Sequence, residues 1–120
     1  MNIIFKVTPD ALLEDVQRLA DEHLRPLERV LAEKAQRAEL TLDVMRDTKQ
    51  QSGNVFNASG NLVVEGAVFH ARARGDSIEL VLDKVRDDLV REVRTSNGRA
   101  KSLLRRGGKA VKSFLRFGRR

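Results

Sequence analysis

The chain has 120 residues, enough for one small domain, and no cysteine, so disulfides and thiolate metal sites are excluded. Its formal net charge of +6 is divided unevenly: residues 1–95 hold 14 Lys and Arg against 17 Asp and Glu, whereas residues 96–120 hold 9 basic and no acidic residues. A basic tail on a slightly acidic body indicates a polyanionic partner, either nucleic acid or an anionic membrane.

The first third of the chain predicts a strand followed by a long helical segment. Residues 2–7 alternate, with Ile3, Phe5 and Val7 on one face of the strand. Thr8 followed by Pro9 is typical of a helix start, with a threonine N-cap and proline at the first helical position. The apolar residues that then recur at helical spacing are Leu12, Leu13, Val16, Leu19, Ala20, Leu24, Leu27, Val30 and Leu31. Pro26 interrupts this pattern and predicts a kink or a division into two helices.

The middle of the chain predicts three strands. Residues 38–46 alternate between apolar and polar side chains, and a polar loop over residues 47–53 follows. Residues 55–64 and 67–74 then read as a hairpin, with Glu65 and Gly66 as its turn. In the last strand, one face holds Ala67, Phe69, Ala71 and Ala73, and the other holds Val68, His70, Arg72 and Arg74.

A second helix follows the hairpin and completes the predicted domain. The run Asp76-Ser77-Ile78-Glu79 has the spacing of an N-cap with an acid in the first turn. One apolar stripe follows, made of Ile78, Leu82, Val85, Leu89 and Val93. The element order is therefore β-α-β-β-β-α, an α+β fold. The crossover through the first helix makes the first two strands parallel and the others antiparallel, in a four-stranded mixed sheet with two helices on one face.

The chain changes character after Arg94. The run Thr95-Ser96-Asn97-Gly98 predicts the end of the helix, and only basic charges lie beyond it. We therefore expect a domain over residues 1–95 and a basic tail over residues 96–120 that is flexible or partly helical. Within the tail, residues 109–117 could form a short amphipathic helix.

The hairpin and the helix after it resemble the ribosome hibernation-promoting factors, also called ribosome-associated inhibitors or ribosomal subunit interface proteins. The resemblance is carried by Gly53, Val55, Phe56, Ala58, Asn61, Leu62, Val64, Gly66, Ala71, Ala73, Gly75, Asp76, Ile78, Leu82, Asp83, Val85, Asp87, Leu89 and Glu92. The segment from Leu103 to Arg119 also resembles the tails of some short members of this family. The resemblance implies a bacterial, cytoplasmic stress-response factor without enzymatic activity, which docks in the decoding channel of the small ribosomal subunit, binds rRNA there and blocks the tRNA and mRNA sites.

The candidate RNA-binding residues lie on the second helix and in the tail. They are Lys84, Arg86, Arg91, Arg94, Arg99, Lys101, Arg105, Arg106, Lys109, Lys112, Arg116, Arg119 and Arg120. On the helix the alternative is a solvated face, because four acids are interleaved with the basic residues and Asp87 has the favourable i,i+4 spacing to Arg91. The alternative for the tail is a solubility tag, against which its leucines and phenylalanines argue. Weaker candidates are Lys6, Arg25, Arg29, Arg72 and Arg74.

No motif predicts catalysis, a cofactor, a metal ion or a small-molecule substrate. His23 and His70 have no ligand-type partner at metal spacing, and we expect the first on a helix surface and the second on a sheet face. The N-terminus does not have the pattern of a signal peptide, and no apolar run approaches a membrane span. Two other functions remain open: a general module for structured RNA, and a peripheral membrane protein anchored by the amphipathic tail.

Overall fold

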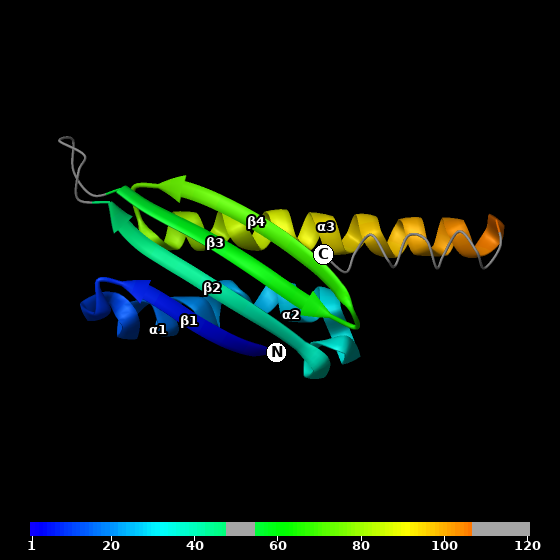
Figure 1. The fold of residues 1–120 in the computed structure, drawn as a ribbon, viewed down its shortest axis with the longest axis horizontal. Coiled ribbons are helices and arrows are strands. Elements are labelled where there is room, and N and C mark those ends of the chain that lie inside the picture. The colour runs from blue at the N-terminus through cyan, green and yellow to red at the C-terminus, as the bar shows by residue number, and fades with distance from the viewer. Residues whose placement is uncertain (48–54, 107–120) are drawn as a thin grey trace.

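The computed structural model describes residues 1–47 and 55–106, with the side chains of its last helix described up to Ser96. The helices and strands are β1 (Asn2–Thr8), a 3-10 helix (Asp10–Leu12), α1 (Leu13–His23), α2 (Arg25–Leu31), a second 3-10 helix (Ala32–Arg37), β2 (Ala38–Asp47), β3 (Val55–Val64), β4 (Ala67–Gly75) and α3 (Ile78–Arg106). All α-helices lie behind one face of the sheet, α1 and α2 beside β1 and β2, and α3 beside β3 and β4 (Figure 1). The predicted fold class and element order are confirmed.

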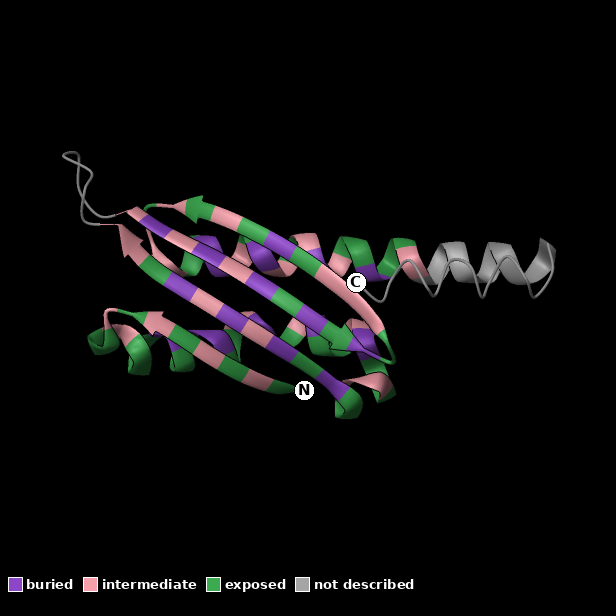
Figure 2. Ribbon diagram, viewed as in Figure 1, coloured by how far each residue is buried: buried purple, intermediate pink, exposed green. Residues whose placement is uncertain are grey.

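The four strands form one sheet in the order β1-β2-β3-β4, with the first pair parallel and the others antiparallel, as predicted. More buried and more exposed residues alternate along β1, β2, β3 and the second half of β4 (Figure 2). On β2, for example, Leu40, Leu42 and Val44 are fully buried, whereas Glu39, which lies between the buried Ala38 and Leu40, is exposed. The period of two therefore selects the face that the helices cover, and leaves the opposite face of the sheet open.

The β3–β4 hairpin turns through only two residues. Val64 lies opposite Ala67, and both Glu65 (φ 49°) and Gly66 (φ 80°) have positive φ angles. Two central residues with positive φ define the tight turn that matches the twist of a hairpin. The Glu65 carboxylate also accepts a hydrogen bond from Arg37 Nη2 at 2.7 Å, which ties the turn to the segment before β2.

The first helical segment starts later than predicted and is divided. Pro9 has an extended backbone (φ −74°, ψ 161°), because β1 continues to Thr8, which pairs with Met45. The predicted Thr8 cap is therefore wrong; Pro9 precedes a 3-10 turn, and α1 begins at Leu13. The predicted division is confirmed: α1 ends at His23, and Pro26 lies in the first turn of α2, where its missing N–H is harmless.

The helix α3 is capped as predicted and covers the hairpin. Leu80 N donates to Ser77 Oγ at 3.1 Å, which satisfies one of the free N–H groups of the first turn. In addition to the predicted stripe, Val81 is fully buried. Gly60 permits close packing beneath the helix, since a Cβ atom there would lie 3.0 Å from Val85 Cγ1.

The end of α3 differs from the prediction. The helix runs to Arg106 and does not stop at the Thr95 to Gly98 segment. A glycine inside a helix costs only about 1 kcal/mol relative to alanine, and the good helix formers that follow, such as Ala100 and Leu103, outweigh one such residue. The helix consequently extends past the end of the sheet (Figure 1).

Candidate nucleic-acid interface

The helical layer behind the sheet leaves an open groove between α2 and α3. Its lining consists of Pro26, Arg29, Val30, Arg86, Asp87, Val90 and Arg94. The groove arises where the chain divides before Pro26, because α2 changes course there and comes to lie against α3. The lining of the groove brings together Arg29 and Arg94, two sequence-predicted candidates that lie far apart in the chain.

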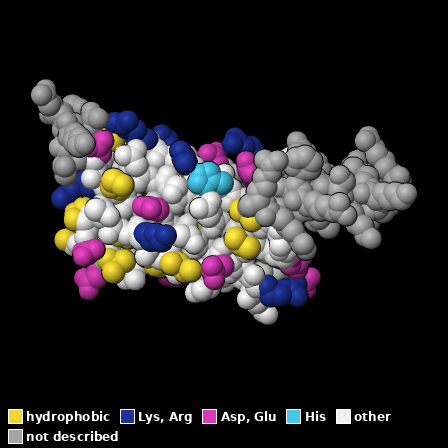
Figure 3. Space-filling model, in the orientation of Figure 1, with side chains coloured by type: hydrophobic (Ala, Val, Ile, Leu, Met, Phe, Trp, Pro, Cys, Tyr) yellow, Lys and Arg dark blue, Asp and Glu magenta, His cyan; other side chains and the backbone are white. Residues whose placement is uncertain are grey.

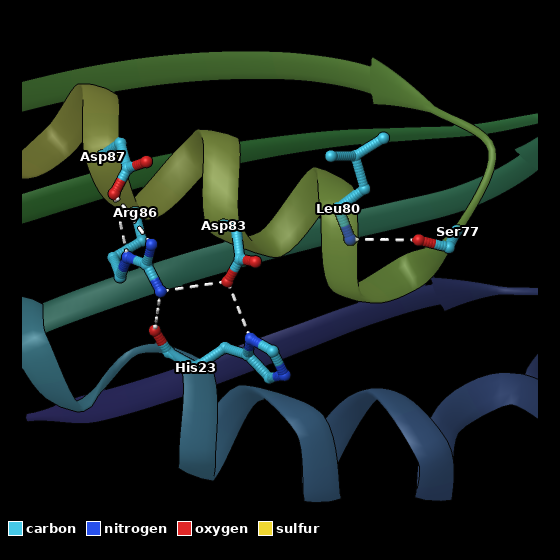
Figure 4. Close-up of polar contacts among 6 residues, drawn as sticks. All are labelled: His23, Ser77, Leu80, Asp83, Arg86 and Asp87. Atoms are coloured by element: carbon cyan, nitrogen blue, oxygen red, sulfur yellow. Dashed lines mark hydrogen bonds and ion pairs between the residues drawn. The ribbon is translucent and has the colours of Figure 1, made fainter.

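Arg86, another candidate, is engaged within the protein (Figure 4). Its guanidinium donates from Nη1 to Asp83 Oδ1 at 2.9 Å and to the carbonyl of His23 at 3.2 Å. The Nε and Nη2 atoms donate to Asp87 Oδ1 at 3.0 and 2.9 Å. Only 21% of this side chain is exposed. Arg86 therefore holds the end of α1 against α3, and little of its charge is left for an external anion.

His23 belongs to the same cluster, which the sequence did not indicate. Its Nδ1 lies 2.7 Å from Asp83 Oδ1, and the side chain is 22% exposed (Figure 4). The predicted helix-surface histidine is thus half-buried at a helix–helix contact. Because the two residues are 60 positions apart, no local pattern could have paired them.

The remaining helix candidates differ in how free their charges are. Lys84 donates to the carbonyl of Arg74 at 3.2 Å, which links α3 to the end of β4. Arg91 pairs with Asp88 at 3.0 Å rather than with Asp87 as predicted, and the carboxylate of Asp87 pairs with Arg86 instead. The Arg91 side chain is 73% exposed, and such surface pairs contribute little. Arg94 is exposed and makes no hydrogen bond or ion pair with the described residues.

The structure describes the backbone of only four of the tail candidates. Arg99, Lys101, Arg105 and Arg106 lie on the last turns of α3, whose side chains are not among those described. Outside the described residues lie Lys109, Lys112, Arg116, Arg119, Arg120 and the predicted short helix over 109–117. The loop predicted over 47–53 also falls largely outside them, since residues 48–54 are not described.

The lining of the groove combines arginines, one carboxylate and apolar side chains. Arg29 and Arg94 line it together with Val30, Val90 and Asp87, and a guanidinium with free N–H groups is suited to phosphate. Within residues 1–47 and 55–106, no cluster of His, Cys, Asp and Glu could hold a metal ion. No helix among those residues is long and apolar enough to cross a membrane.

The structure predicts different consequences for two arginines of this groove. We expect Arg86→Ala to lower the free energy of unfolding by ~1–3 kcal/mol, because Asp83, Asp87 and a backbone carbonyl lose a charged donor. Arg94→Ala should change it by less than ~0.5 kcal/mol, as for other surface substitutions. Urea unfolding followed by circular dichroism measures both. Equal losses in the two variants would contradict the assignment of Arg86 to the scaffold.

Comparison with known proteins identifies the fold. No family model and no curated protein matches the sequence. Among solved structures, a ribosomal subunit interface protein from Coxiella burnetii aligns with 82% of this chain and 99% of its own, with a TM-score of 0.64 and 11% identity. The Protein Y N-terminal domain from Thermus thermophilus aligns with 79% of this chain and 98% of its own, with a TM-score of 0.53 and 18% identity. The resemblance is thus confirmed at the level of the fold: the chain has the β-α-β-β-β-α fold of a ribosomal subunit interface protein.

Proposed function

We propose that this protein binds the small ribosomal subunit and inhibits translation by occupying the channel that tRNA and mRNA use. The observation that carries the proposal is the fold, shared over nearly the whole length of a ribosomal subunit interface protein. A fold alone does not determine function, so the surface must also suit rRNA. Arg94 and Arg29 at the groove, with Arg91 next to them on α3, supply cations on the side from which α3 continues into the basic tail.

The mechanism is steric competition without turnover. Guanidinium groups of the groove and cations of the tail bind phosphates of the small-subunit rRNA, and the domain then fills space that tRNA and mRNA need. The body over residues 1–95 carries −3, so its approach to rRNA depends on the +9 of residues 96–120. We accordingly propose that the two segments have separate roles: the domain provides shape, and the tail provides long-range attraction.

The cellular role follows from this mechanism. A protein that blocks the channel reversibly would keep ribosomes idle during stress, in the cytoplasm of a bacterium. It would need no cofactor, metal ion or small-molecule substrate.

The test combines sedimentation with a translation assay. The protein should comigrate with the small subunit in a sucrose gradient and compete with initiator tRNA for it. In a bacterial cell-free extract, inhibition should become complete near one protein per ribosome, because a steric block does not turn over. Inhibition far below that ratio would indicate an enzyme. Binding to any duplex RNA but not to ribosomes would favour the structured-RNA module, and binding to anionic vesicles alone would favour the membrane anchor.

A further inference from the structure

The open face of the sheet carries a segregated charge pattern at β3 and β4. The outward side chains of these strands are Val55, Asn57, Ser59, Asn61, Val63, Val68, His70, Arg72 and Arg74. None of them is acidic, although the body as a whole is acidic. Viewed from this side, dark blue side chains and a histidine lie along the edge where Figure 1 places β4, with some acidic side chains between and beside them (Figure 3). The acid nearest in the strand register is Asp43 of β2, opposite Ser59, and it lies next to Lys6 of β1.

The strand register arranges these residues as a ladder. Arg74 lies opposite Asn57, Arg72 opposite Ser59, and His70 opposite Asn61. Each of these register pairs therefore places one arginine or histidine of β4 opposite one amide or hydroxyl side chain of β3. We call these six residues the β3–β4 ladder. In the part of the chain that the structure describes, β4 is an edge strand, and no further strand there limits access to it.

A chain of hydrogen bonds holds one arginine of the ladder in position. Arg72 Nε donates to His70 Nε2 at 3.1 Å, so the imidazole carries its proton on Nδ1, which donates to Asn61 Oδ1 at 2.5 Å. The terminal nitrogens of Arg72 and the amide nitrogen of Asn61 make no hydrogen bonds to the described residues. Arg72 is thus oriented through Nε while its outer N–H groups stay available to a ligand.

The spacing of the ladder suits a chain of regularly repeated anions. Residues two apart on a strand are separated by ~6.6–6.8 Å, comparable to the distance between consecutive phosphates of an extended nucleic acid strand. Arg72 and Arg74 could therefore contact successive phosphates.

We propose that the β3–β4 ladder binds the sugar–phosphate backbone of single-stranded RNA laid along β4. The amides and the hydroxyl of β3 offer both donors and acceptors next to the cations, which suits a ribose 2′-hydroxyl better than an acidic peptide. No Phe, Tyr or Trp points outward from these strands, and the one outward aromatic ring, that of His70, is held by its hydrogen bonds to Asn61 and Arg72. The strands therefore offer no row of stacking platforms, and we expect binding that is independent of sequence. This surface lies on the opposite side of the sheet from the helices and their groove.

The experiment maps the binding of an oligouridylate of about ten nucleotides to the full-length protein by NMR. Backbone amides of β3 and β4 should shift on titration. In Arg72→Gln/Arg74→Gln these shifts should disappear, and the slope of log affinity against log salt should become less steep by ~1.4, at roughly 0.7 per contact with a single strand. Arg72→Lys keeps the charge but loses the Nε hydrogen bond, so its affinity should lie between those of the native chain and a Gln variant.

The matched control for Arg72→Gln alone is Arg18→Gln, which removes the same single charge from an exposed position of α1. It should leave the β3–β4 shifts intact. Shifts confined to α3 and the residues beyond it, or an equal loss in the control, would overturn the proposal. Polyglutamate shifting the same amides as strongly as the RNA would also overturn it. Because the readout uses free RNA and no ribosomes, it is independent of the proposed ribosome function.

Discussion

Leu82→Asp is expected to abolish folding of the domain. Leu82 is fully buried in the core between α3 and the sheet, where the described residues include no buried polar or charged side chain. An aspartate at this position would have to bury a carboxylate without a partner or keep it protonated at neutral pH. Either cost is large compared with the ~5–15 kcal/mol that stabilises a typical domain. Circular dichroism should therefore show no cooperative thermal transition.

Leu80→Asp provides the matched control, since the same exchange is made two residues earlier in the same helix. Leu80 is 38% exposed and lies in the first turn, where a negative charge interacts favourably with the helix dipole. This variant should keep its transition. A cooperative transition in Leu82→Asp would refute the packing of α3 on the sheet.

Neutralising the end of the chain is expected to have the largest effect on ribosome binding. Replacing Lys109, Lys112, Arg116, Arg119 and Arg120 by glutamine removes five positive charges and leaves α3 intact. If all five contact phosphates, the slope of log affinity against log salt should become less steep by ~3.5–4.5, at roughly 0.7–0.9 per contact. Cosedimentation with small subunits over a series of salt concentrations measures this slope.

Phe114→Ala/Phe117→Ala tests the apolar part of the same segment. The charge is retained, so the slope should stay constant while affinity falls at every salt concentration. An unchanged affinity and slope in the glutamine variant would show that these cations do not anchor the protein, and the proposed role of the tail would then be wrong.

The strands could be predicted closely because their pattern is local. Residues 2–7, 38–46, 55–64 and 67–74 were expected, and each strand lies within two residues of these bounds. Wherever one face of a sheet is buried, apolar and polar residues alternate along the strand with a period of two, and this alternation is visible in the sequence. The Glu65–Gly66 turn and the Ser77 cap are equally local, since both depend on neighbouring residues.

The errors concern positions where tertiary contacts or neighbouring segments compete with a local signal. Thr8 was expected to cap a helix, but pairing with β2 keeps it in a strand. The stop expected at Thr95 to Gly98 did not end α3. The division of the chain into residues 1–95 and 96–120 stays a prediction, although the helix crosses that boundary.

The sequence by itself determined the fold class, the faces of the strands and the separation of a neutral-to-acidic body from a basic end, because periodicity and composition are properties of the chain. The tertiary structure decided which charges are free. Arg86 and Arg94 look alike in the sequence, and both line the groove. The first is bonded to Asp83, Asp87 and the end of α1, whereas the second makes no hydrogen bond or ion pair with the described residues. Likewise, Arg72 acquires its orientation from His70 and Asn61 only when β3 pairs with β4. The physical reason is that a cation binds the nearest anion or acceptor in space, and residues distant in the chain become neighbours only through folding.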